Sequence, residues 1–343
     1  VDATKNQTFN IVNIGTNSHT FSNVAFNNDG YKCHVTTVVN PKDANNSELI
    51  STDPVLSTRV VKPFDDVISD DVDFQASNIL FPTLDNQDIS ISFDVSPTLA
   101  NKLAAIGLEF RHYKVDLISQ GLDNSNDVSF NIETIGTTTH TFNSVAFNND
   151  GYKCQVTCDY KPRDADSATQ SIQSATVISS RIVKPFDDVI SDDVNFQASN
   201  VQFTTLLNQS ISIGFSVSNT LSNDLTARGL EFKHYKVELI DQGGDVNKYK
   251  FDEIGDIGTT TYTFTSVSYN NSGYKCQVTC VYNPRDADSA SIDIPSATVT
   301  NGVRTVIPYD NIVNDDSNFT LLSPSIDSFV NVTDANRVTV TWQ

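Results

Sequence analysis

The sequence predicts an all-β protein made of tandem antiparallel β-sandwiches, and three observations lead to this prediction. First, the stretch GYKCQVTCVYNP at 273–284 has close copies at 151–162 and 30–41, which start 122 and 121 residues apart. Second, each copy alternates apolar and polar residues with a period of two, as a half-buried strand does. Third, turns rich in Asn, Asp and Gly separate the strand-like pieces between the copies. A unit of this length closes its own core, which a solenoid unit of roughly 20–45 residues cannot do.

The repeat spacing also divides the chain. Residues 1–67 match the second half of the repeat, and 68–189 and 190–312 are complete copies. Residues 313–343 match the opening strands of a further copy. Because the chain also lacks methionine, we expect a segment of a longer protein or a processed product.

Within the copy at 190–312 we expect seven strands separated by turns. They cover 197–205, 210–217, 230–240, 248–254, 260–267, 274–282 and 296–307. Short strands at such regular intervals are typical of an antiparallel sandwich.

One piece between the second and third strands is predicted to be helical. In the copy at 68–189, Ser96 and Pro97 supply an N-cap and a first-turn proline, and Gly107 supplies a C-terminal glycine. The pattern returns over 219–229 in the next copy. We expect a helix of about two turns that plugs one end of the sandwich. The alternative is a contact surface for a neighbouring module or chain.

The charge balance excludes several classes of partner. A net charge of −20, from 42 acidic and 22 basic residues, leaves no basic face for a nucleic acid. An acidic surface also disfavours binding to anionic membranes. No run approaches the roughly 18 apolar residues of a membrane span. We therefore expect neither nucleic-acid binding nor membrane insertion.

The five cysteines are expected to be free thiols. Cys154 and Cys158 lie four residues apart on one expected strand, which is about 13 Å. A disulfide needs Cα atoms within about 7 Å. In the first copy Thr37 replaces the second cysteine and leaves Cys33 without a local partner. We interpret all five cysteines as small buried apolar residues, which fits folding in a reducing compartment.

Several motifs together resemble the fibronectin type III family. The run Arg337–Trp342 resembles the second strand of that family, and His234–Val237 resembles the Tyr-x-Val of its third strand. The segment from Tyr262 to Cys280 resembles its fifth strand, corner and sixth strand. The copies depart from the family in their length and extra helix, and in Phe93 and Phe215, which stand where the family has Trp. No Arg-Gly-Asp occurs, so integrin-type binding has no support.

The resemblance implies that one tyrosine in each copy ties its hydroxyl back across the corner before the sixth strand. A buried phenol needs such a hydrogen-bond partner. The structural core residues expected on this strand are Tyr31, Tyr152, Tyr274, Cys33, Cys154, Cys158, Cys276 and Cys280.

Acidic clusters are the best candidates for a binding site. In a sandwich of this topology, the linker entering a module, the loop with the helix and the loop after the sixth strand share one end. Oxygen ligands gathered there would suit Ca²⁺, a hard cation. The candidate ligands are Asp187, Asp188, Asp192 and Asp193 in the linker and Asp286 and Asp288 in the loop. The alternative is that these aspartates are solvated residues that form turns.

No pattern in the sequence indicates catalysis. The five histidines show no metal-ligand spacing, and no GxSxG, P-loop or HExxH motif occurs. We expect a non-catalytic structural segment of an extended fibre, stalk or filament, of viral or microbial origin, with neighbouring copies of itself as partners. One alternative is an adhesive array that binds a host-surface receptor or glycan, and another is a set of accessory modules of a larger carbohydrate-active enzyme. The expected location is a virion surface, a cell surface or the extracellular space.

Overall fold

A computed structural model describes residues 3–43, 47–121, 124–245 and 248–310. The chain falls into two compact units. The first comprises Val1–Asp188 together with Ala227–Gly229 and Pro284–Ala290, and the second comprises the remainder. The strand expected at Arg337–Trp342 lies outside the described residues.

The first complete repeat contains two antiparallel sheets. One has the order β5-β6-β9 and is formed by β5 (Ser77–Asp85), β6 (Asp88–Asp94) and β9 (Thr139–Phe142). The other has the order β11-β10-β7-β8, with β12 also paired to β10. Its strands are β7 (Leu108–Ser119), β8 (Val128–Ile132), β10 (Tyr152–Pro162), β11 (Ile172–Gln173) and β12 (Val177–Ile178).

The second complete repeat has the same two sheets. The smaller one has the order β13-β14-β17, from β13 (Ser199–Leu207), β14 (Ser210–Ser216) and β17 (Thr261–Phe264). The larger one has the order β16-β15-β18-β19, with β20 paired to β18. Its strands are β15 (Leu230–Asp241), β16 (Lys250–Ile254), β18 (Tyr274–Pro284), β19 (Ile294–Pro295) and β20 (Val299–Thr300). The predicted tandem β-sandwich fold is confirmed.

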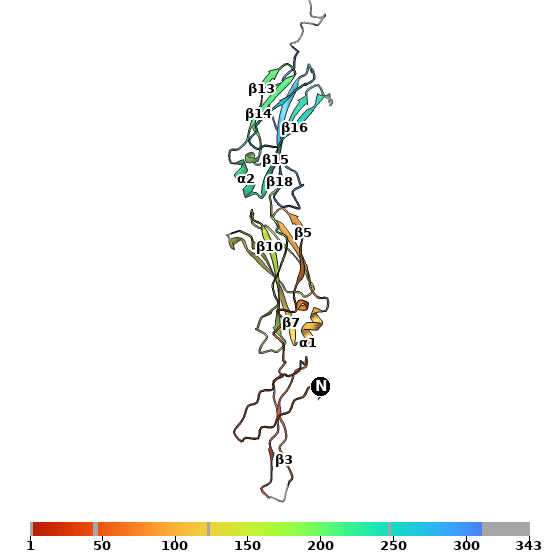
Figure 1. Cartoon of the computed structure of the whole chain (residues 1–343), viewed down its shortest axis with the longest axis vertical. Coiled ribbons are helices and arrows are strands. Elements are labelled where there is room, and N and C mark those ends of the chain that lie inside the picture. The colour runs from red at the N-terminus through yellow and green to blue at the C-terminus, as the bar shows by residue number, and fades with distance from the viewer. Residues whose placement is uncertain (1–2, 44–46, 122–123, 246–247, 311–343) are drawn as a thin grey trace, which may run out of the picture. The chain divides into compact units, whose positions relative to one another are not determined.

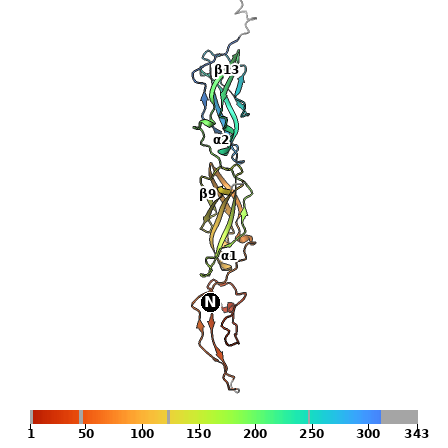
Figure 2. The ribbon, with the colours of Figure 1, turned by 90° about the vertical axis from the view of Figure 1, so that its left-hand side faces the viewer.

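A short helix joins the two sheets of each repeat, as predicted. Helix α1 (Leu99–Ala105) follows β6 and lies against β7, and α2 (Leu221–Ala227) takes the same place in the second repeat (Figures 1 and 2). The N-cap position is Thr98 and not Ser96, because Ser96–Leu99 forms a separate turn in which the Leu99 N–H donates to the Ser96 carbonyl. Two leucines per helix, Leu99 and Leu103 in α1, are buried under the sandwich. Single-turn 3₁₀ helices also occur: η1 (Ala3–Lys5), η2 (Val72–Phe74), η3 (Asn124–Asn126) and η4 (Val194–Phe196).

The strand predicted over 296–307 is mostly irregular. Only β20 and the isolated bridge between Tyr274 and Val306 pair with β18 there. The physical reason is that side chains replace part of the backbone ladder. The Ser296 hydroxyl accepts the Cys280 N–H at 3.1 Å while the Ser296 N–H donates to the Cys280 carbonyl at 2.8 Å.

Strand β10 shows the expected alternation in the core. Tyr152, Cys154, Val156, Cys158 and Tyr160 are all fully buried between the sheets. Fully burying a side chain of valine size contributes about 1.5–3 kcal/mol. This row is therefore a main source of stability for the repeat.

The segment before the first complete repeat has a different character. Its strands are two-residue pairs, β1 (His34–Val35) with β4 (Val55–Leu56) and β2 (Val38–Val39) with β3 (Ile50–Ser51). Val35 is 62% exposed, whereas its counterpart Val156 is 0% exposed. Cys33 is also exposed, so the expected burial is wrong for this cysteine. The strands that cover Cys154 in a complete repeat have no counterpart in the described ranges 3–43 and 47–66.

Candidate functional site

The tyrosine corners are built alike in all three copies. The hydroxyls of Tyr31, Tyr152 and Tyr274 donate to backbone carbonyls six residues upstream, at 2.7, 2.9 and 2.8 Å. Burial raises the pKa of Tyr152 to about 12, with a further contribution from the Asp127 charge. Burial also raises the pKa of Tyr274, so the phenols of Tyr152 and Tyr274 are structural hydrogen-bond donors with no acid–base role near neutral pH.

A buried carboxylate links Asp164 to the segment that precedes the first complete repeat. One oxygen of Asp164 accepts from the Arg59 guanidinium at 2.7 Å, and the other accepts from the Lys62 N–H at 2.9 Å. Arg59 also pairs with Asp166 at 2.8 Å. The Lys62 amide and then the Arg59 charge hold the pKa of Asp164 below its ordinary value. We call this group of four residues the Arg59 joint.

The same arrangement recurs 122 residues later. Asp286 accepts from the Arg181 guanidinium at 2.7 Å and from the Lys184 N–H at 2.9 Å, and Asp288 pairs with Arg181 at 3.0 Å. All four residues belong to the first compact unit, because Pro284–Ala290 is part of it. We call them the Arg181 joint. Two copies with matching partners and distances indicate a repeated feature of the chain.

Further contacts hold Arg181 in place on the side away from the aspartates. Arg181 Nη1 donates to the Phe81 carbonyl at 3.4 Å, and the guanidinium carbon lies 5.9 Å from the centre of the Phe81 ring. The Ser179 hydroxyl donates to the Arg181 carbonyl at 3.1 Å and accepts from the Cys154 N–H at 3.0 Å. The guanidinium is therefore preorganised for a carboxylate, which reduces the entropy lost on pairing.

Close backbone packing accompanies both joints. Gly107, just after α1, has φ +77°, and a Cβ there would lie 2.2 Å from the Pro63 carbonyl oxygen. Gly229 makes the same approach to Pro185. The Arg163 guanidinium donates to Asn28 in the preceding corner turn at 3.0 Å. The corner turn and the aspartate loop therefore meet in the first compact unit.

The predicted calcium ligands are divided among separate interactions. Asp187 forms an ion pair with Arg228, Asp188 donates its N–H to Asn86, and Asp193 caps η4. Asp192 is exposed, and Asp286 and Asp288 share Arg181. Within the described ranges, no three His, Cys, Asp or Glu side chains gather in a way that could hold a metal ion. The calcium site predicted from the sequence is left untested.

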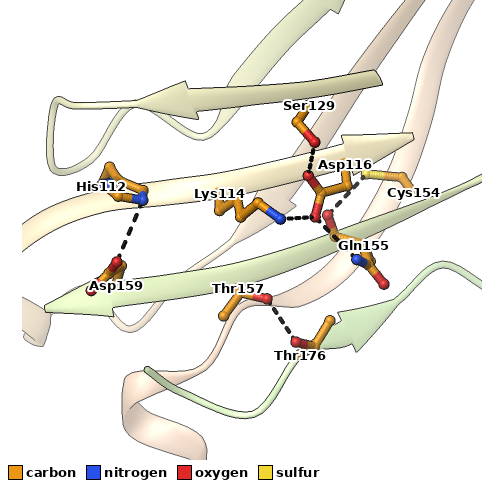
Figure 3. Close-up of polar contacts among 9 residues, drawn as sticks. All are labelled: His112, Lys114, Asp116, Ser129, Cys154, Gln155, Thr157, Asp159 and Thr176. Atoms are coloured by element: carbon orange, nitrogen blue, oxygen red, sulfur yellow. Dashed lines mark hydrogen bonds and ion pairs between the residues drawn. The ribbon is translucent and has the colours of Figure 1, made fainter. Parts of the chain in front are cut away.

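A second polar cluster lies on the outward face of the β7–β8–β10 sheet (Figure 3). Asp116 is only 2% exposed and accepts from Ser129, from Lys114 at 3.0 Å and from Gln155 at 3.0 Å. Burial by itself would raise the pKa of Asp116, but the three hydrogen bonds outweigh burial and lower it. Nearby, His112 faces Asp159 at 3.5 Å, and the Thr157 and Thr176 hydroxyls are 2.7 Å apart.

The second repeat keeps this cluster with different residues. Glu238 accepts from Lys236 at 2.7 Å, from Gln277 at 2.7 Å and from the Tyr249 hydroxyl. Its pKa is also lowered, because these hydrogen bonds outweigh burial. A carboxylate bound by three donors is a stable anion with little capacity to accept a proton. The cluster stabilises the sheet face.

Sequence reasoning missed this cluster because outward positions on a strand were expected to face solvent. The signal was present as an acidic residue between two core residues of the third strand, Asp116 in one repeat and Glu238 in the next. The buried thiols of Cys154 and Cys276 are no nucleophiles either, because burial raises the pKa of both to about 12.

The strand order of the two sheets makes each complete repeat a fibronectin type III-like sandwich, to which the short connecting helix is an addition. No protein-family model matches the chain, and no curated protein matches it. Among solved structures, the chain is similar to the FN1–FN3 domains of chicken CNTN1, with 10% identity, 77% of this chain and 71% of that chain covered, and a TM-score of 0.27. It is also similar to a two-domain fibronectin type III segment of chicken tenascin, with 10% identity, 67% and 99% covered, and a TM-score of 0.24.

In the described part of the chain, no helix has the length and apolar character needed to cross a membrane.

Proposed function

We propose that the chain is a non-catalytic structural segment of an extended fibre, stalk or filament. The observation that carries this proposal is the repeated joint, in which Arg59 binds Asp164 and Arg181 binds Asp286 with the same distance of 2.7 Å. A module whose only task was to bind a ligand would not need the same linker contact twice.

The chemistry of the joint suits a mechanical role. Hydrogen bonds between charged groups are shorter and roughly twice as strong as neutral ones. In each joint the aspartate accepts from a backbone N–H of the linker as well as from the guanidinium. The linker is therefore held by its main chain and by a side chain. Such a linker resists bending better than a solvated acidic one, whose charges repel one another.

In this proposal the partners are neighbouring copies of the same module, on a virion surface, a cell surface or outside the cell. The buried thiols of Cys154, Cys158, Cys276 and Cys280 are compatible with folding in a reducing compartment before export or assembly.

Small-angle X-ray scattering of the full chain tests the mechanical role. We expect the double variant Arg59→Ala/Arg181→Ala to broaden the distribution of intramolecular distances relative to the natural chain. Arg111→Ala, which removes an arginine that belongs to neither joint, is the matched control and should change nothing. An unchanged distribution in the double variant would contradict a stiffening role.

A binding measurement on the same protein distinguishes the adhesive alternative from the structural role. A purely structural segment does not bind intact host cells or a glycan array, and saturable binding in either experiment would favour the adhesive alternative.

A further inference from the structure

Arg304 occupies in the second complete repeat the position that Arg59 and Arg181 occupy in their copies. Its backbone is anchored in the same way. Asn301 accepts the Cys276 N–H at 3.2 Å and donates to the Arg304 carbonyl at 2.7 Å. Ser179 makes the equivalent two bonds around Arg181.

The Arg304 guanidinium is also anchored like that of Arg181. Its Nη1 donates to the Phe203 carbonyl at 3.0 Å, and its central carbon lies 5.7 Å from the centre of the Phe203 ring. The difference lies on the other side of the guanidinium, where Arg181 binds Asp286 and Asp288. Among the described residues, no carboxylate forms an ion pair with Arg304. A planar guanidinium fixed on one edge presents its remaining N–H groups for a carboxylate.

A second donor lies beside it. Ile307 holds the position of Lys62 and Lys184, whose N–H groups each donate to a joint aspartate at 2.9 Å. Its backbone is fixed by the preceding residue, because the Val306 N–H donates to the Tyr274 carbonyl at 3.0 Å. Within the described ranges the Ile307 N–H has no acceptor. Arg304 and this amide together reproduce the two donors of a joint.

Two further features of the Arg181 joint, an aromatic ring and a side-chain acceptor, have counterparts in the second complete repeat. Tyr309 takes the place of Phe186, and the two N–H groups donate to equivalent carbonyls, those of Asn208 and Asn86. Phe186 is 3% exposed, whereas Tyr309 is 42% exposed. The side-chain oxygen of Asn208 is buried and accepts no hydrogen bond from the described residues, whereas that of Asn86 accepts the N–H of linker residue Asp188.

We propose that Arg304, the Ile307 N–H and Tyr309 form a docking site for a further module of the same kind. The occupant would present the first aspartate of an Asp-Ala-Asp loop to the two donors. It would also present a glycine after its helix to the backbone near Tyr309, as Gly229 does beside Phe186. Asp164 and Asp286 of this chain are already bound in their own joints, so the occupant is an additional module. The site can fail to bind while the proposed structural role stands, because the Arg59 and Arg181 joints do not depend on it.

The test uses an extended chain in which residues 190–312 occur twice in succession, with the second copy directly after Ile312. Hydrogen exchange at the Ile307 amide is the direct readout. We expect exchange about tenfold slower in the extended chain than in the natural one. Arg304→Ala in the extended chain should remove most of that protection, whereas Arg111→Ala should leave it.

A double-mutant cycle separates a true pair from a general loss of stability. Arg304→Ala and an Asp→Ala change at the position of Asp286 in the added copy should be non-additive in their effect on Ile307 exchange. Additive effects, or equal exchange in the extended and natural chains, would overturn the proposal. Protection in the natural chain that rises with protein concentration would also overturn it, because both Asp-Ala-Asp loops of a second molecule are already bound in its own joints.

Discussion

Arg181 and Asp286 lie 105 residues apart in the sequence and 2.7 Å apart in the structure, and so do Arg59 and Asp164. In both pairs the aspartate is almost fully buried, while the arginine is partly exposed. The carboxylate therefore depends on its two donors, because an anion removed from water without partners is strongly destabilising. This dependence leads to the first prediction.

Asp286→Ala should lower the free energy needed to open the Arg181 joint locally by about 1–2 kcal/mol. The reason is that it removes the charge-assisted hydrogen bonds to Arg181 and to the Lys184 N–H. Asp288→Ala, in the same loop, is the matched control. Its side chain is exposed and, among the residues that the structure describes, pairs with Arg181 alone, so its effect should stay within about 0.5 kcal/mol. Hydrogen exchange at the Lys184 amide measures both, and equal effects would show that the backbone bond contributes nothing.

Acid should destabilise the repeats through their buried carboxylates. The pKa values of Asp116 and Glu238 are lowered in the folded chain from ordinary values of 3.8 and 4.5. As pH falls, the unfolded chain therefore takes up these protons before the folded chain does. The stabilisation is complete above about pH 5 and is lost as the pH falls through these values toward the folded pKa. Urea midpoints measured between about pH 6 and pH 3 should fall with pH, and Asp116→Asn should make that fall shallower.

Thiol labelling should distinguish Cys33 from the other four cysteines. Cys33 is exposed, whereas the others are buried and burial raises the pKa of each of them. Brief treatment of the native chain with iodoacetamide near neutral pH should add one label, and treatment in urea should add five. Mass spectrometry of the intact protein gives both numbers. Rapid native labelling of Cys158 would contradict the packing of β10.

Removal of calcium should leave the melting temperature unchanged. Arg181 already lies between Asp286 and Asp288, and Asp187 is paired with Arg228, so these oxygens are neutralised by guanidinium groups. Thermal unfolding with calcium and with a chelator measures the difference. A rise of several degrees in calcium would revive the metal site predicted from the sequence.

Much of the fold followed from local pattern. The alternation in 274–282 predicted β18, and the Ser-Pro start with a closing glycine predicted α1, with the same pattern predicting α2. The edge strand over 296–307 was predicted as regular because periodicity does not reveal that Ser296 takes over a backbone hydrogen bond of Cys280. Local side-chain competition with the sheet ladder is visible only once the two segments are adjacent.

The sequence predicted where the candidate site lies but not which groups form it. The sequence indicated that the linker, the helix loop and the aspartate loop meet at one end of the module. It did not identify Arg59 or Arg181 as the cation, because a contact across more than 100 residues leaves no trace in local spacing. Comparison of the repeats held the clue, since Arg59 and Arg181 each precede a Val-Lys-Pro-Phe run and each aspartate follows an arginine.

The two joints draw every contact from the same positions of the repeat, so a copy inserted or lost as a whole unit would leave the flanking linkers chemically unaltered. A gene encoding such a chain can change in length by unequal crossing-over between its near-identical copies without needing compensating substitutions. The number of modules can therefore change in whole steps without new contacts at the joints.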